Sequence, residues 1–125
     1  MTTDYRGVVP YLYVDDANAA IAWYERVFGF EALNRWTDDQ GRVQNAELRL
    51  GETELWLDGS GRRKDTDERP HWIGIWVNDV DAVYERVQAA GIACDPPVDR
   101  EFGVRMLNVA DGMGYLWGFI RRTTD

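Results

Sequence analysis

Apolar and polar positions in the first half of the chain predict one helix set among four strands. Residues 7–14 are rich in β-branched and aromatic residues, which is typical of a strand. Apolar residues then recur at helical spacing from 17 to 28, after two aspartates that can cap a helix. Three more strands are predicted at 30–37, 42–50 and 53–57, separated by turns that contain glycine. The predicted order is strand, helix, strand, strand, strand.

The second half of the chain repeats this order. Residues 71–77 predict a strand, and an apolar stripe from 80 to 90 predicts a helix. A strand is then predicted to begin at 92–94, where two prolines soon interrupt it. Two strands at 104–109 and 115–120, joined by a glycine-containing turn, complete the half.

The two halves also match in spacing, which indicates an internal duplication. Val14 and Val77, at the end of the first strand of each half, lie 63 positions apart. Gly29 and Gly91, which end the helices, lie 62 positions apart, and both values are half the chain. In each half a helix covers one face of a sheet and the other face stays open. Two such halves packed edge to edge would form a cup, which is a suitable site for a small molecule.

We therefore predict an α+β fold in which two βαβββ modules form a curved mixed sheet around a cup-shaped cleft. The 125 residues fit a single domain over 1–125. Its modules are predicted at about 5–58 and 71–122. The polar and charged residues 59–70 are predicted to connect them.

Charge and composition restrict the classes of partner. A net charge of −8 repels phosphates, so we expect no nucleic-acid partner. The same charge would attract cationic ligands, although it also serves solubility. The chain has no apolar run long enough to span a membrane and begins without a signal-peptide pattern. Cys94 is its only cysteine, so no internal disulfide can form, and we expect a cytoplasmic protein without a membrane partner.

Three segments resemble the vicinal oxygen chelate superfamily, which includes glyoxalases and bleomycin-resistance proteins. Residues 9–16 and 20–30 are similar to the first strand and helix of that family. Residues 102–115 are similar to its last hairpin. The resemblance covers nearly the whole chain and implies paired βαβββ modules. It leaves the chemistry open, because the superfamily includes both metalloenzymes and proteins that only bind a ligand.

The resemblance also implies four positions that carry metal ligands in the enzymes of the family. In this sequence they fall at Val9, Trp56, Trp72 and Gly118, and none of these side chains can ligate a divalent cation. The only histidine, His71, is one residue from a ligand position, but a slip of one residue turns a strand side chain to the opposite face. We therefore predict no metal and no other cofactor.

Aromatic residues take the place of the metal ligands in this prediction. The chain has six tryptophans, six tyrosines and four phenylalanines, which either fill a core or line a site for flat ligands. Strand alternation groups several of them on faces that would line the cup, with Trp36 and Phe102 at its rim and Gly118 leaving room at its floor. The predicted ligand-binding residues are Val9, Tyr11, Trp36, Glu54, Trp56, Trp72, Trp76, Phe102 and Gly118.

We therefore hypothesise that the protein binds and sequesters a small aromatic molecule, such as an antibiotic, without a metal. The negative net charge of the protein would favour a cationic molecule. The resemblance favours the bleomycin-resistance branch, whose members act without turnover and as homodimers, so we expect a homodimer and no enzymatic activity. The alternative is a metal-dependent lyase, isomerase or oxygenase of the glyoxalase or dioxygenase type with shifted ligands. A metal-free enzyme and a sensor domain also stay open.

Overall fold

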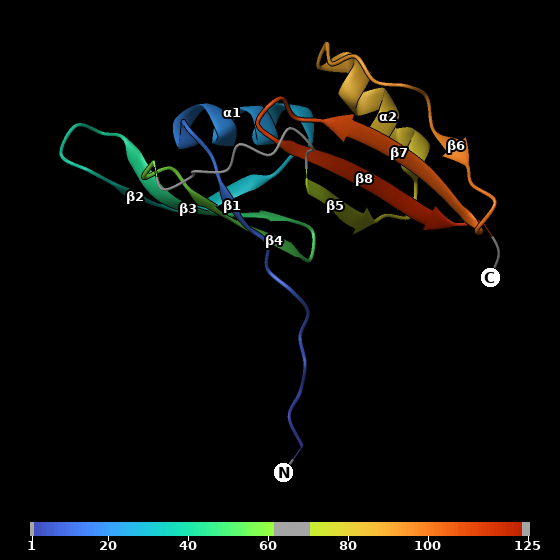
Figure 1. The fold of residues 1–125 in the computed structure, drawn as a ribbon, viewed down its shortest axis with the longest axis horizontal. Helices are drawn as coiled ribbons and strands as arrows, with labels where there is room; N and C mark the ends of the chain where they lie inside the picture. The colour runs from blue at the N-terminus through green and yellow to red at the C-terminus, as the bar shows by residue number, and fades with distance from the viewer. Residues whose placement is uncertain (1, 62–70, 124–125) are drawn as a thin grey trace. The chain divides into compact units, whose positions relative to one another are not determined.

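The computed structural model describes residues 2–61 and 71–123, which form two helices and two four-stranded mixed sheets (Figure 1). This confirms the predicted α+β class with two βαβββ modules. The first module contains β1 (Tyr11–Tyr13), α1 (Ala17–Val27), β2 (Glu31–Thr37), β3 (Val43–Leu50) and β4 (Thr53–Asp58). The second contains β5 (His71–Trp76), α2 (Val80–Ala89), β6 (Val98–Asp99), β7 (Val104–Ala110) and β8 (Tyr115–Arg122).

The strand order is the same in both sheets. It is β1-β4-β3-β2 in the first and β5-β8-β7-β6 in the second, with the first two strands parallel and the others antiparallel. The backbone N–H of Val14 donates to the Asp58 carbonyl over 2.9 Å, and that of Val77 donates to the Ile120 carbonyl over 2.9 Å. These equivalent bonds lie at the duplicated spacing seen in the sequence.

The chain divides into two compact units. Unit 1 comprises residues 1–25 and 29–64, and unit 2 comprises residues 26–28 and 65–125. The core of unit 1 is formed by one face of its sheet and the buried stripe of α1. Its buried side chains include Leu12, Ala17, Ala20, Ile21, Tyr24, Leu48, Leu55 and Leu57. Because these residues alternate along the strands, the other face of the sheet is left to the polar and aromatic residues between them.

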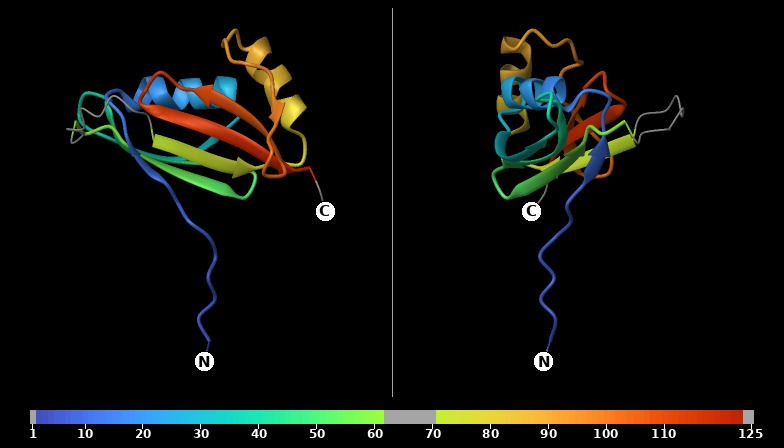
Figure 2. Two further views of the ribbon diagram at one scale, coloured as in Figure 1. Left: turned by 45° about the vertical axis from the view of Figure 1, so that its right-hand side comes forward. Right: turned by 90° about the vertical axis from the view of Figure 1, so that its left-hand side faces the viewer.

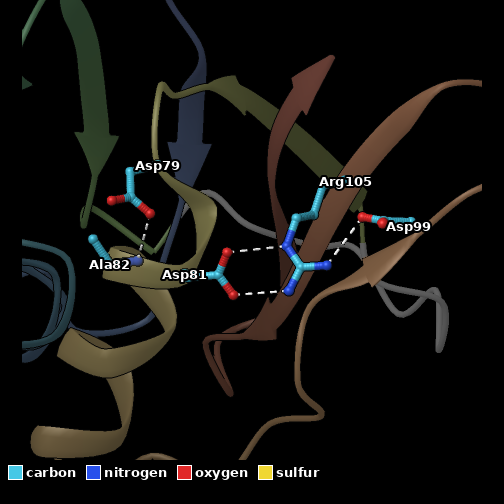
Figure 3. A network of polar contacts seen from close by, with 5 residues as sticks. All are labelled: Asp79, Asp81, Ala82, Asp99 and Arg105. Carbon is cyan, nitrogen blue, oxygen red and sulfur yellow. Dashed lines mark hydrogen bonds and ion pairs between the residues drawn. The ribbon is translucent and has the colours of Figure 1, made fainter. Parts of the chain in front are cut away.

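In unit 2, α2 packs against β7 and β8 (Figure 1). Asp79 caps α2 by accepting a hydrogen bond of 3.0 Å from the Ala82 N–H (Figure 3). Arg105 on β7 donates two hydrogen bonds to Asp81, of 3.0 and 2.8 Å, and a third of 3.0 Å to Asp99 (Figure 3). These bonds hold the pKa of Asp81 below its ordinary value and raise that of Arg105. The network joins the start of α2 to the β6–β7 edge of its sheet.

The turn between β7 and β8 is organised by a buried carboxylate. Asp111 accepts hydrogen bonds from the backbone N–H groups of Met113 (2.7 Å) and Tyr115 (3.2 Å), and from Trp117 Nε1 (3.1 Å). Gly112 and Gly114 have positive φ angles of 74° and 103°, which favour glycine in this turn. Trp117 lies in the core of unit 2, against the ring of Phe28.

Two predicted strands differ from those in the structure. The strand predicted over 7–14 is only Tyr11–Tyr13, and residues 2–10 form an extended, mostly exposed segment (Figure 2). Pro10 has no N–H to donate to a ladder, which accounts for the late start. No strand begins at 92–94, and the short β6 starts only at Val98, after the two prolines. Of the predicted connector, residues 62–70 lie outside the described residues.

Neither of the described helices is long and apolar enough to cross a membrane.

Candidate ligand-binding site

The open face of the unit 1 sheet carries two rows of side chains that run across its four strands. Cross-strand register places Tyr11, Trp56, Glu47 and Asn34 in one row. It places Tyr13, Asp58, Asn45 and Trp36 in the next. The rings of Tyr11 and Trp56 meet edge to face with their centroids 6.1 Å apart, and those of Tyr11 and Tyr13 are 5.4 Å apart. The face therefore combines aromatic rings with amide and carboxylate groups.

A hollow of about 400 Å³ lies on this face. This volume is in the range of small-molecule sites. Three partly exposed rings provide most of its aromatic surface, and one carboxylate and one amide provide the polar groups. Its lining residues are Tyr11, Trp36, Asn45, Ala46, Glu47, Trp56 and Leu57.

Hydrogen bonds fix the polar groups around the hollow. The Tyr11 hydroxyl donates to Asn45 Oδ1 over 2.6 Å and lies 3.3 Å from Asp58 Oδ2. Asn34 Nδ2 donates to Glu47 Oε1 over 2.7 Å, which orients that carboxylate from the neighbouring strand. Within the described part of the chain, Glu47 forms no ion pair.

Asp58 and Glu54, on the same face, also accept hydrogen bonds from within the protein. Asp58 is buried, and its Oδ1 accepts hydrogen bonds from the Ser60 N–H (2.8 Å) and hydroxyl (2.6 Å). Glu54 Oε1 accepts from Trp56 Nε1 over 3.2 Å. Glu54 was predicted to line the site, yet Glu47 is the glutamate at the hollow.

The open face of the unit 2 sheet is also aromatic. Trp72 and Trp76 on β5 are exposed on the same side, as strand alternation predicts. The Trp72 indole lies over Gly74 and Gly118, and its Nε1 donates to Asn108 Oδ1 over 3.0 Å. The room that Gly118 was expected to leave for a ligand is therefore filled by the Trp72 ring.

Val9 and Phe102, which were also predicted as site residues, do not line the hollow. Val9 precedes β1 and is part of the extended segment, 38% exposed. Phe102 is 69% exposed in the turn between β6 and β7. Of the nine predicted residues, Tyr11, Trp36 and Trp56 line the hollow.

Sequence reasoning missed Asn45 and Glu47, although a signal for them was present. Ala46 and Leu48 are buried, and alternation on β3 must turn Asn45 and Glu47 to the opposite face.

The donor chemistry at the four family ligand positions does not fit a metal. Val9 and Gly118 have no donor atom in their side chains, and the indole N–H groups of Trp56 and Trp72 donate hydrogen bonds to Glu54 and Asn108. His71 is the first residue of β5 and is exposed, and its ring lies 6.0 Å from that of Tyr115. Residues 2–61 and 71–123 contain no group of three or more His, Cys, Asp and Glu side chains placed to hold a metal ion.

Comparison with known proteins supports the fold and the family. TioX from Micromonospora sp. ML1 is similar in structure, with a TM-score of 0.78 and 31% identity, over 91% of this chain and 96% of that chain. The fosfomycin resistance protein FosX from Listeria monocytogenes shares the fold, with a TM-score of 0.70 and 17% identity, over 99% of this chain and 97% of that chain. An uncharacterised protein of Mycobacterium tuberculosis (strain ATCC 25618 / H37Rv) is 31% identical over 118 residues, which are 86% of this chain and 69% of that protein.

A family model covers most of the chain. It is described as Glyoxalase/Bleomycin resistance protein/Dioxygenase superfamily, and it matches residues 7–119. The chain therefore belongs to the glyoxalase/bleomycin resistance protein/dioxygenase superfamily.

Proposed function

We propose that this protein binds and sequesters a planar aromatic organic molecule, such as an antibiotic, without a metal. One observation supports this above all: the hollow on the unit 1 sheet combines the rings of Tyr11, Trp36 and Trp56 with the carboxylate of Glu47. A flat ligand would contact the rings, and Glu47 would accept hydrogen bonds from its amine or cationic group. Sequestration needs only affinity, which such a surface supplies.

The expected energies fit specific binding. Each ring pair contributes about 0.5–1.5 kcal/mol beyond area burial. A cationic group over a ring face adds about 0.5–2 kcal/mol. Glu47 is the carboxylate suited to pair with that cation, because it lines the hollow, whereas Asp58 and Glu54 do not.

Calorimetric titration with bleomycin-type, mitomycin-type and other planar aromatic antibiotics tests the proposal. Trp56→Ala should weaken binding of the compound that binds by about 2 kcal/mol, or roughly 30-fold, if Trp56 is a hot spot. The matched control is Trp23→Phe on α1, since Trp23 packs on Tyr24 and does not line the hollow. Failure of every compound to bind, or equal affinity for the two variants, would contradict the proposal.

Glu47→Gln tests the role of the carboxylate. Binding of a cationic compound should weaken, while binding of a neutral compound of similar shape should change little. An equal loss for both compounds would mean that Glu47 acts through shape or hydrogen bonding rather than through charge.

Two further measurements separate sequestration from the metal-dependent alternative. Mass spectrometry should recover the bound compound unchanged, and elemental analysis of protein purified without chelator should find no stoichiometric metal. Chemical conversion of the compound, or one equivalent of bound metal, would favour an enzyme. The homodimer implied by the family resemblance is tested by sedimentation equilibrium.

A further inference from the structure

Two polar side chains on β3, those of Asn45 and Glu47, line the hollow of unit 1. They are two positions apart, so they lie on the same face of the strand, about 7 Å apart along it. Each is bound by a neighbouring residue through one of its two polar atoms. The chemistry of the second atom in each pair therefore decides which ligands the hollow accepts.

The Tyr11 hydroxyl fixes the orientation of the Asn45 amide. It donates to Asn45 Oδ1 over 2.6 Å, whereas its distance to Asp58 Oδ2 is 3.3 Å. A carboxamide has one acceptor oxygen and one NH2 group with two donors, so an oxygen engaged by Tyr11 leaves the NH2 group for a ligand. Asn45 Nδ2 has no hydrogen-bond partner within residues 2–61 and 71–123. Asn45 therefore offers donors to the hollow.

Glu47 offers the opposite chemistry, because an ionised carboxylate only accepts hydrogen bonds. Asn34 Nδ2, on the neighbouring strand β2, donates to Glu47 Oε1 over 2.7 Å. Glu47 Oε2 has no hydrogen-bond partner in the part of the chain that the structure describes. Strand β3 thus presents a donor at position 45 and an acceptor at position 47, beside the rings of the hollow.

We propose that Asn45, held by Tyr11, makes the hollow specific for aromatic amines that also carry a carbonyl oxygen on the ring system. The carbonyl oxygen accepts from Asn45 Nδ2, and the amine donates to Glu47 Oε2. This inference rests on the proposed function and narrows its class of ligand. Tyr11 is a positioning residue in this respect, since its hydroxyl acts on the ligand through Asn45.

The selectivity follows from the cost of an unmatched donor. An aromatic amine without a carbonyl covers the Asn45 NH2 group and removes it from water without giving it an acceptor. A carbonyl in the ligand replaces the lost water. One such hydrogen bond changes an affinity by roughly fivefold.

The test uses 2-amino-9-fluorenone and 2-aminofluorene, which share a planar ring system and an amine. They differ in one group, a carbonyl in the first and a methylene in the second. Titrations followed by tryptophan fluorescence give the ratio of their two dissociation constants. The parent protein should bind the ketone roughly fivefold more tightly. Trp56→Ala should weaken the binding of both compounds, because Trp56 lines the hollow.

Variants at the two positions test how the selectivity arises. Asn45→Ala removes the donors, and Tyr11→Phe keeps the ring but removes the hydroxyl that orients them. The affinity ratio should fall to about one in both variants. Asn45→Asp keeps the shape and places an acceptor oxygen at the position of Nδ2, so the ketone should bind more weakly than 2-aminofluorene.

Tyr13→Phe is the matched control, with the same substitution on the same face of β1. Tyr13 does not line the hollow, so this variant should keep the parent's affinity ratio. A purely structural effect of any variant would weaken both compounds together and leave the ratio unchanged. Circular dichroism establishes that each variant is folded.

Three outcomes would overturn the inference. They are equal affinity of the parent protein for the two compounds, a parental ratio in both Asn45→Ala and Tyr11→Phe, and no Trp56-dependent binding of either compound. The proposed function fails separately, if Trp56→Ala leaves binding of the antibiotic panel unchanged.

Discussion

Replacing Asp111 with alanine should destabilise the fold, because this carboxylate serves several donors in the β7–β8 turn. The side chain is 5% exposed and accepts from Trp117 Nε1 and from the backbone of Tyr115 and Met113. Met113 is partly exposed, so water can replace the carboxylate there. Trp117 is 1% exposed, and its N–H would be left in the core without that acceptor.

The size of the effect follows from the two buried donors. A buried donor that loses its acceptor costs about 1–3 kcal/mol, and the bonds of Trp117 and Tyr115 are both affected. Removing the carboxylate also relieves its own desolvation, which offsets part of the loss. We therefore expect a loss of about 2 kcal/mol in the free energy of unfolding. With a slope of about 2 kcal/mol per molar urea, the unfolding midpoint should fall by about 1 M.

Urea unfolding followed by circular dichroism measures this shift. Asp39→Ala is the matched control, since Asp39 is exposed in the β2–β3 turn and its loss should cost less than about 0.5 kcal/mol. Asp111→Asn should fall between the two, because its amide oxygen still accepts from the backbone. If the Asp111→Ala midpoint lay within about 0.2 M of the parent protein, the carboxylate would not organise the turn and the argument would be wrong.

Two further predictions concern titration. Hydrogen bonding to Arg105 lowers the pKa of Asp81, so the pair stabilises the fold at pH values above the ordinary carboxyl pKa. This stabilisation is lost as the pH falls through the lowered pKa of the folded protein. The urea midpoint of Asp81→Asn should therefore fall less steeply with acid than that of the parent protein, and an unchanged slope would contradict this. Partial burial and, to a smaller extent, the Asp95 charge raise the pKa of the Cys94 thiol, so iodoacetamide should alkylate it more slowly at about pH 8 than in the urea-unfolded chain. Asp95→Asn should raise the folded-state rate, and equal rates in folded and unfolded protein would rule out the shift.

Local patterns were sufficient to predict most elements of the fold. The helical spacing from 17 to 28 and from 80 to 90 predicted α1 and α2 to within one residue at each end. The short β1 and the missing strand at 92–94 show where composition misleads, because proline removes the N–H that a ladder requires. An apolar, β-branched segment therefore forms a strand only where its backbone donors can be paired.

The candidate site was harder to predict because it depends on cross-strand register. Alternation correctly placed Trp72 and Trp76 on one face of β5. It could not show that the Trp72 ring lies over Gly118, since that depends on a strand 46 positions away in the sequence. Glu47 could have been found by alternation on β3, but its link to Asn34 again depends on pairing with another strand.

The two sheets present their rings in different ways because equivalent positions of the duplicated modules carry different residues. Tyr11 and Trp56 are register partners in unit 1, and the equivalent partners in unit 2 are Gly74 and Gly118, at offsets of 63 and 62 positions. In unit 1 the paired positions carry the rings themselves, which leaves a hollow beside them. In unit 2 the same positions carry no side chain, and Trp72, from the position equivalent to Val9, lies over them. A Trp56→Gly change alone would therefore remove one ring of the hollow without reproducing the unit 2 arrangement, because Tyr11 keeps its ring and Val9 has none to lie over the space.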